Sequence, residues 1–109
     1  MSYDERLAKR VRLVLKRRRG VAEKKMFGGL AFLMRGNMLC GVLEQDLMVR
    51  IGPDSYEQAL HLPHAREMDF TGRPLKGMVY VDAAGVRTAK QLKAWIERGI
   101  QFVNSLPAK

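Results

Sequence analysis

The sequence holds a single cysteine, Cys40, among 109 residues, and aromatic residues make up only 7%. One cysteine cannot form a disulfide within the chain, which excludes the class of small secreted domains held by disulfides. Cys40 lies in an apolar run and is expected as a small buried hydrophobic residue. The chain also lacks a run of about 20 apolar residues that would span a membrane. Its N-terminus carries Asp4 and Glu5 and lacks the apolar core of a secretory signal. These absences predict a cytoplasmic protein.

Residues for a metal site or a catalytic site are equally scarce. The two histidines, His61 and His64, flank Pro63, and with one cysteine they cannot complete a structural zinc set of Cys and His. We therefore expect no metal and no cofactor, and we place both histidines in a solvated loop. No serine lies in a nucleophile-elbow motif. A non-enzymatic protein is predicted, and a small enzyme of unknown type, built on a carboxylate pair, is the least favoured alternative.

Positive charge is concentrated at one end of the chain. Hydrophobic residues make up 47% and charged residues 28%, as in ordinary globular proteins, and we expect one domain over residues 1–109. The net charge is +9. Residues 1–35 hold eleven Lys and Arg against three acidic residues, a net +8, whereas the rest holds nine against eight. Such a potential attracts an acidic protein, a nucleic acid or an anionic membrane surface.

The apolar residues of the first segment recur at helical spacing and predict a helix over residues 4–18. Four of them share one face, flanked by rows of Lys and Arg: Leu7, Val11, Val14 and Leu15. Leu13 is predicted on the outside. Arg17, Arg18 and Arg19 are predicted in the last turn, where cations interact favourably with the helix dipole, and Gly20 should end the helix.

The remaining pattern predicts an α+β fold. Four β-prone runs separated by turn residues indicate an antiparallel meander at 22–27, 30–35, 38–43 and 46–51. A short middle helix follows from residue 52 to about 61, and a further strand pair is expected at 67–70 and 78–83. Thr88 and Gln91 form a capping box that begins a last helix, which Pro107 should end. The predicted fold is an antiparallel β-sheet, a meander plus the further strand pair, flanked by N- and C-terminal helices and the short middle helix.

Gly28 and Gly29, within KKMFGGLAF, are the most distinctive short motif. Paired glycines indicate a tight turn with positive φ or a close approach of two backbones. The spacing matches neither of the glycine-rich phosphate-binding patterns, and a strand rather than a helix follows. We therefore predict a structural hairpin turn here.

A basic cluster in the front third is the candidate binding site for a polyanion or a protein partner. Its residues are Lys9, Arg12, Lys16, Arg17, Arg18, Arg19, Lys24 and Lys25. Arginine binds phosphate with two parallel hydrogen bonds, which keeps nucleic acid open as a partner. However, no aromatic residues for base stacking are interleaved, and no helix-turn-helix spacing is present. A membrane surface is disfavoured, because the apolar face of the first helix is needed for the core.

The segments KKMFGGLAFLMRGNMLCGV, LMVRIGPDSYEQAL and FTGRPLKGMVYV resemble the N-terminal domain of the TfoX family, also called Sxy. The resemblance continues into the last helix and implies a stand-alone α+β domain with an antiparallel sheet flanked by helices. In the competence regulator of that family, a helical second domain follows, and the protein promotes expression of DNA-uptake genes with the cyclic-AMP receptor protein. The family supplies no catalytic residues.

We therefore expect a non-enzymatic regulatory or adaptor domain that acts by protein–protein interaction in transcriptional control. Direct nucleic-acid binding through the basic front third is the alternative. The identity of the protein partner and the oligomeric state stay open.

Overall fold

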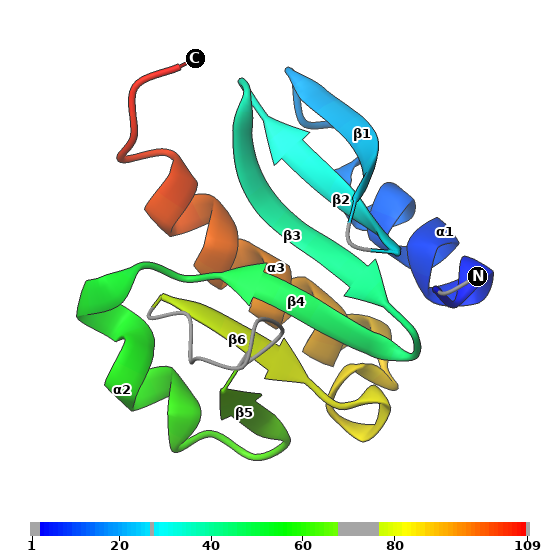
Figure 1. The fold of residues 1–109 in the computed structure, drawn as a ribbon, viewed down its shortest axis with the longest axis vertical. Coiled ribbons are helices and arrows are strands. Elements are labelled where there is room, and N and C mark those ends of the chain that lie inside the picture. Colours follow the sequence, from blue (N-terminus) through cyan, green and yellow to red (C-terminus); the bar gives the residue numbers. More distant parts are fainter. Residues whose placement is uncertain (1–2, 27, 68–76, 109) are drawn as a thin grey trace.

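A computed structural model describes residues 3–26, 28–67 and 77–108. Six strands form one sheet in the order β1-β2-β3-β4-β6-β5, with every neighbouring pair antiparallel. The strands are β1 Val21–Met26, β2 Gly29–Met34, β3 Asn37–Leu43, β4 Asp46–Arg50, β5 Ala65–Glu67 and β6 Met78–Val81. The helices are α1 Glu5–Leu15, α2 Tyr56–Leu60 and α3 Ala89–Val103, with 3-10 turns η1 Pro53–Ser55 and η2 Ala83–Val86. The predicted α+β class, with an antiparallel sheet and three flanking helices, is confirmed (Figure 1).

The predicted meander is confirmed, and a further strand pair, β5 with β6, follows it. Strands β1 to β4 follow one another in both sequence and space. The next strand, β5, covers residues 65–67 and includes residue 67 of the predicted 67–70, while residues 68–70 lie outside the described part. Strand β6 pairs with β4 on one side and with β5 on the other. The sheet therefore ends in two edge strands, β1 and β5.

Helix α1 begins as expected but ends earlier than predicted. The Asp4 carboxylate accepts the N–H groups of Arg6 and Leu7, as an N-cap does. The helix ends at Leu15, so the arginines at 17–19 lie beyond it and do not occupy its last turn. The chain turns away there, because Gly20 has a φ of 75° and its carbonyl accepts the N–H of Arg35, at 2.8 Å. This bond already belongs to the pairing between the β1 and β2 ends.

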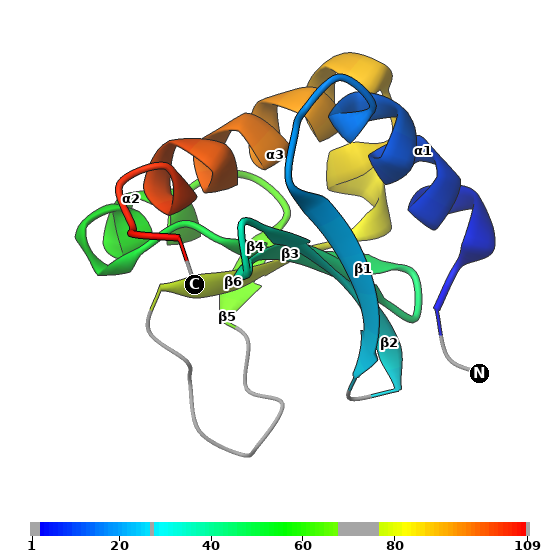
Figure 2. The ribbon, with the colours of Figure 1, turned by 90° about the horizontal axis from the view of Figure 1, so that it is seen from above.

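The main core lies between the sheet and the layer formed by α1 and α3 (Figure 2). The buried face of α1 consists of Leu7, Ala8, Val11 and Leu15, while Leu13 is 69% exposed, as predicted. Cys40 is buried in this core, as expected, and burial raises the pKa of its thiol to about 12. A thiol in that state remains protonated at neutral pH and behaves as a small apolar side chain.

The opposite face of the sheet carries a second, smaller apolar cluster. Met48 and Tyr80 are buried there, against Met38, Leu43 and Met78. Their neighbours along the strands, such as Leu47 and Val49, belong to the main core, as the alternation of side chains along a strand requires. Within the described residues, no helix is long and apolar enough to cross a membrane.

Helix α3 begins at the predicted capping box. The Thr88 hydroxyl accepts the N–H of Gln91 at 3.1 Å, and the Gln91 side chain accepts the N–H of Thr88 at 3.0 Å. We expect Thr88→Ala to lower the free energy of unfolding by about 1 kcal/mol, because the Gln91 N–H in the first turn loses its acceptor. Urea denaturation measures the loss. Thr88→Ser keeps the hydroxyl and should lose clearly less, and equal losses for both variants would contradict the capping role.

Candidate interaction surface

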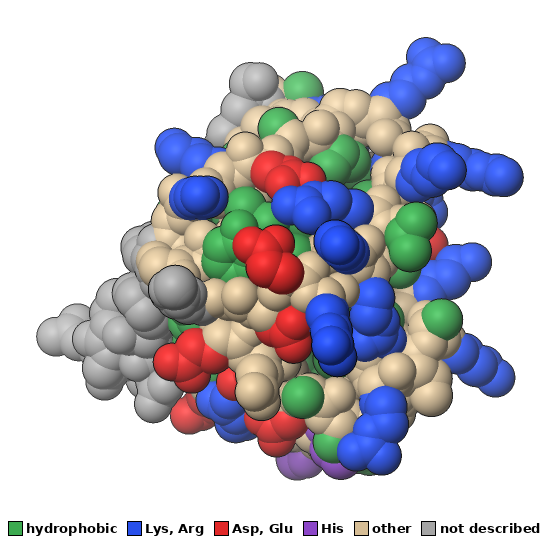
Figure 3. Space-filling model, turned by 90° about the vertical axis from the view of Figure 1, so that its right-hand side faces the viewer, with side chains coloured by type: hydrophobic (Ala, Val, Ile, Leu, Met, Phe, Trp, Pro, Cys, Tyr) green, Lys and Arg blue, Asp and Glu red, His purple; other side chains and the backbone are tan. Residues whose placement is uncertain are grey.

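The eight candidate residues lie on one continuous stretch that leads from α1 into the edge strand β1. Lys9 and Arg12 are on α1, residues 16–19 form the connection, and Lys24 and Lys25 are on β1. All are exposed except Arg12, which is half-buried. Figure 3 shows Lys and Arg side chains along the right-hand part of this face, with Asp and Glu nearer its centre and lower left. The structure thus distributes the predicted residues over α1, the connection and β1, and it leaves them unequally available.

Arg12 is occupied by an ion pair with Glu23 on β1. Its Nε and Nη2 donate to the two carboxylate oxygens, at 2.7 and 2.9 Å. The hydrogen bond from Arg12 is the largest of the effects that lower the pKa of Glu23, and the same bond raises the pKa of Arg12. This planar two-bond contact joins α1 to the edge strand. Arg12 is therefore not a free cation.

We expect Arg12→Gln to raise the pKa of Glu23 towards its usual range, which an NMR titration of the side-chain carboxyl measures. Because the pKa of Glu23 is depressed in the folded protein, the pair stabilises above the unfolded pKa, and that stability is lost as pH falls through the folded pKa. Both side chains are more than a third exposed, at 39% and 37%, so the pair contributes below about 1 kcal/mol. Arg12→Lys should give an intermediate pKa, and an unchanged pKa in Arg12→Gln would contradict the assignment.

On α1 and its connection to β1, two arginines besides Arg12 also have fixed partners. Arg18 donates to Glu97 of α3 at 2.9 Å. Arg10, outside the predicted set, donates to the carbonyl oxygens of Val86 and Arg87 at 2.7 and 3.1 Å. These contacts fasten α1 and its connection to the C-terminal part of the chain.

Five of the eight predicted cations make up what we call the basic strip. Its members are Lys16, Arg17, Arg19, Lys24 and Lys25, and none has a side-chain hydrogen bond or ion pair with another described residue. Lys9 is unpaired in the same sense, but it lies earlier on α1. Exposed cations without partners keep their full charge for an incoming anion. The strip runs from the end of α1 along β1.

Strand β1 also presents unpaired backbone, a feature that sequence reasoning missed. Among the described strands it pairs only with β2, and its residues from 22 to 25 are exposed. In an antiparallel pair, the backbone N–H and C=O groups of successive residues alternately bond the neighbouring strand and point away from it. The Gly20 carbonyl accepts the N–H of Arg35, which follows β2. Every second residue from Gly20, at 22, 24 and 26, therefore bonds β2 in the same way. The N–H and C=O groups of Val21, Glu23 and Lys25 therefore face away from the sheet.

Comparison with known protein families assigns most of this chain to one of them. Residues 14–103 match the family model of the TfoX N-terminal domain. The chain belongs to the TfoX N-terminal domain family. No curated protein and no solved structure matches it. The match begins at Val14, so the whole basic strip lies inside the family domain, whereas Lys9 and Arg12 precede the matched region.

In this TfoX-family domain, the two glycines of the motif have different roles. Met26 pairs with Gly29, so residues 27 and 28 separate β1 from β2, and of the two glycines predicted in the turn only Gly28 lies between the strands. Gly28 has a φ of 76°, which glycine adopts readily because it has no Cβ. Gly29 has no positive φ and lies in β2, where a Cβ would run into the carbonyl oxygen of Val42 on β3. The turn thus needs the first glycine, and the close approach of β3 needs the second.

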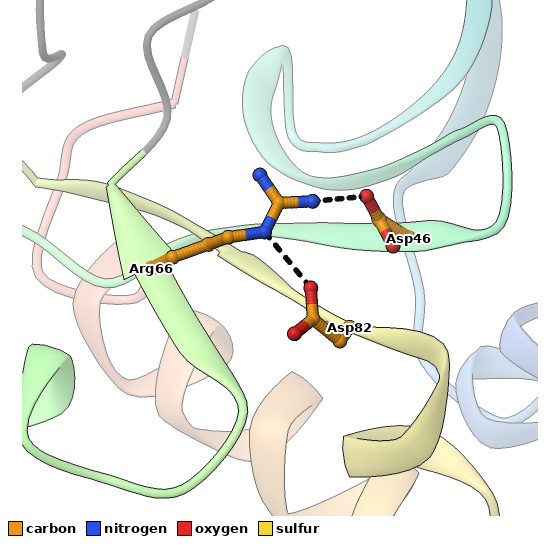
Figure 4. A network of polar contacts seen from close by, with 3 residues as sticks. All are labelled: Asp46, Arg66 and Asp82. Atoms are coloured by element: carbon orange, nitrogen blue, oxygen red, sulfur yellow. Dashed lines mark hydrogen bonds and ion pairs between the residues drawn. The ribbon is translucent and has the colours of Figure 1, made fainter.

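A second polar cluster lies on the sheet face opposite the helices. Arg66 of β5 is hydrogen-bonded to Asp46 of β4 and, at 2.8 Å, to Asp82 after β6, and it lies over the Tyr80 ring (Figure 4). Burial is the main cause that raises the pKa of Asp46. The cluster ties the short edge strand β5 to its neighbours, and each carboxylate in it already has a cationic partner.

The surface hollows bring together few reactive groups. One is lined by His64, Gln91, Trp95 and Arg98, and a second by Asp54, Ser55 and Phe102 among others. Both histidines are exposed, as expected. In the described ranges, no three His, Cys, Asp or Glu side chains gather as a metal site would require.

Proposed function

We propose that this domain is a non-enzymatic regulatory or adaptor module that binds an acidic protein partner through the basic strip. The proposal is carried by five cations that have no side-chain partner among the described residues and lie along a strand edge with outward-facing backbone groups. Cations steer an acidic partner to the surface and set its orientation. The backbone groups add contacts that a simple polyanion does not need.

Membership in the TfoX N-terminal domain family supports a role in transcriptional control. The proposal also includes a cytoplasmic location, which the single buried cysteine supports, because disulfides are rare in that compartment. A non-enzymatic role is supported by the hollow around Trp95 and Arg98. Its described lining includes the exposed His64 but no Ser, Thr or Cys side chain that could act with it as a nucleophile.

Direct nucleic-acid binding is the second candidate function. The observation that favours it is the run of Lys16, Arg17 and Arg19, whose charges have no partner in the described part of the chain. Its weakness is that no aromatic residue belongs to the strip, so bases would have no stacking platform there. Backbone phosphates would be the only groups recognised.

A titration with three anionic ligands separates the two functions. The ligands are a glutamate-rich peptide, a DNA duplex and a single-stranded RNA of matched charge, each titrated between about 50 and 200 mM salt. We expect the peptide to bind most tightly and to retain affinity at the upper salt concentration. Tighter binding of DNA or RNA, with a steep loss of affinity in salt, would replace the proposal by the nucleic-acid function. No binding of any ligand at low salt would contradict both.

A further inference from the structure

We infer that the partner binds by adding an extended acidic segment as a seventh strand at the outer edge of β1. This inference rests on the proposed function, because it names how the acidic partner is held. The outward N–H and C=O groups of Val21, Glu23 and Lys25 provide the hydrogen bonds. Figure 2 looks onto β1 from outside the sheet, and no other described segment is drawn across it.

The side chains of β1 specify the sequence of that segment. Lys24 and Lys25 are adjacent, so they project from opposite faces of the strand. Glu23 lies on the helix side, where Arg12 neutralises it, and Lys25 shares that side. Two consecutive carboxylates in an added strand would therefore meet one lysine on each face. On the face away from the helices, Lys24 stands between the apolar Ala22 and Met26, which favours small apolar residues around the acidic pair.

A second copy of this chain fits the edge poorly. Pairing two β1 strands would bring Lys24 and Lys25 close to the same lysines of the other copy, with ten strip cations around one interface. Like charges on neighbouring strands destabilise a sheet, and lysines on edge strands prevent self-association for this reason. An acidic strand from another protein removes that repulsion. Charge thus selects a different partner over self-pairing.

Amide hydrogen exchange of the intact chain tests strand addition residue by residue. The probe is a blocked nine-residue peptide with two adjacent glutamates among alternating valine and threonine. In the free protein, the amides of Ala22, Lys24 and Met26 should exchange slowly, since they bond β2. Bound peptide should slow exchange at Val21, Glu23 and Lys25 by at least about tenfold. Unchanged exchange at these three amides under saturating peptide would overturn the inference.

Two controls separate backbone pairing from charge. Lys25→Pro removes an outward N–H while sparing the β2 ladder, since proline is tolerated at edge positions of this kind. Its affinity for the peptide should be about tenfold lower than that of Lys25→Gln, which loses the same charge but keeps the N–H. A peptide N-methylated on its β1-facing residues should lose binding similarly and needs no protein variant.

The outcomes for the inference and for the proposed function differ. Salt-dependent peptide binding that is equal in Lys25→Pro and Lys25→Gln, with no loss on N-methylation, would overturn strand addition and leave the acidic partner in place. Absence of peptide binding at low salt would overturn both. Protection of the same amides without peptide, accompanied by a dimer in sedimentation, would show self-pairing and overturn the inference.

Discussion

Gly29→Ala is expected to lower the free energy of unfolding by about 3 kcal/mol, near the upper end of the cost of overpacking. The new methyl group would run into the backbone carbonyl of Val42 and press on the side chain of Leu43. A backbone oxygen in the middle of a sheet cannot rotate away, so β2 and β3 would have to separate. The replacement adds one carbon atom, and the effect arises from its position alone.

Gly28→Ala is the matched control, because it adds the same methyl group one residue earlier. Gly28 lies between the two strands with a φ of 76°. Gly28→Ala should therefore lower the free energy of unfolding by about 1 kcal/mol, the strain of a left-handed residue with a Cβ. Urea denaturation of both variants measures the difference. A larger loss in Gly28→Ala than in Gly29→Ala would contradict the assignment of turn and close approach to the two glycines.

Reversing three charges of the basic strip should have the largest effect on binding. We expect the combined variant Lys16→Glu, Arg17→Glu and Arg19→Glu to bind the glutamate-rich peptide about 100-fold more weakly at low salt. The three side chains have no partners in the described part, so their replacement breaks no internal ion pair. The free energy of unfolding should therefore change little, which urea denaturation checks.

A matched triple variant controls for the change in net charge. Arg87→Glu, Lys90→Glu and Lys93→Glu alters net charge equally at exposed positions outside the strip. This variant should bind the peptide within a few-fold of the original chain, because charges outside the contact act only through screened, longer-range forces. Equal losses in the two triple variants would show that overall charge, and not the strip, determines binding.

Local signals in the sequence were sufficient for much of the fold. The capping box at Thr88 and the turn at Gly28 were predicted because each depends on a few neighbouring residues. The end of α1 was predicted too late, since favourable arginines at 17–19 did not reveal that Gly20 already pairs with Arg35. The position of β6 between β4 and β5 depends on pairing between distant segments. Hydrophobic patterns do not encode that pairing.

The candidate surface was predicted in its location but not in its chemistry. Composition showed where the cations are, whereas the partners of Arg12 and Arg18 are 11 and 79 residues away and emerge only on folding. The open edge of β1 follows from strand order, which no local motif specifies. The alternation of its backbone groups could have been derived from the predicted hairpin, once β1 was known to be an edge.

The most direct test of the proposed site maps amide chemical shifts of the intact chain during titration with the glutamate-rich peptide. We expect the largest chemical-shift changes along residues 16–25, from the connection after α1 through β1. Smaller changes are expected at β5, the opposite edge strand of the sheet, and at α2 beside it. Saturable binding with its largest shifts away from residues 16–25, for example around Met48 and Tyr80, would contradict the proposed surface.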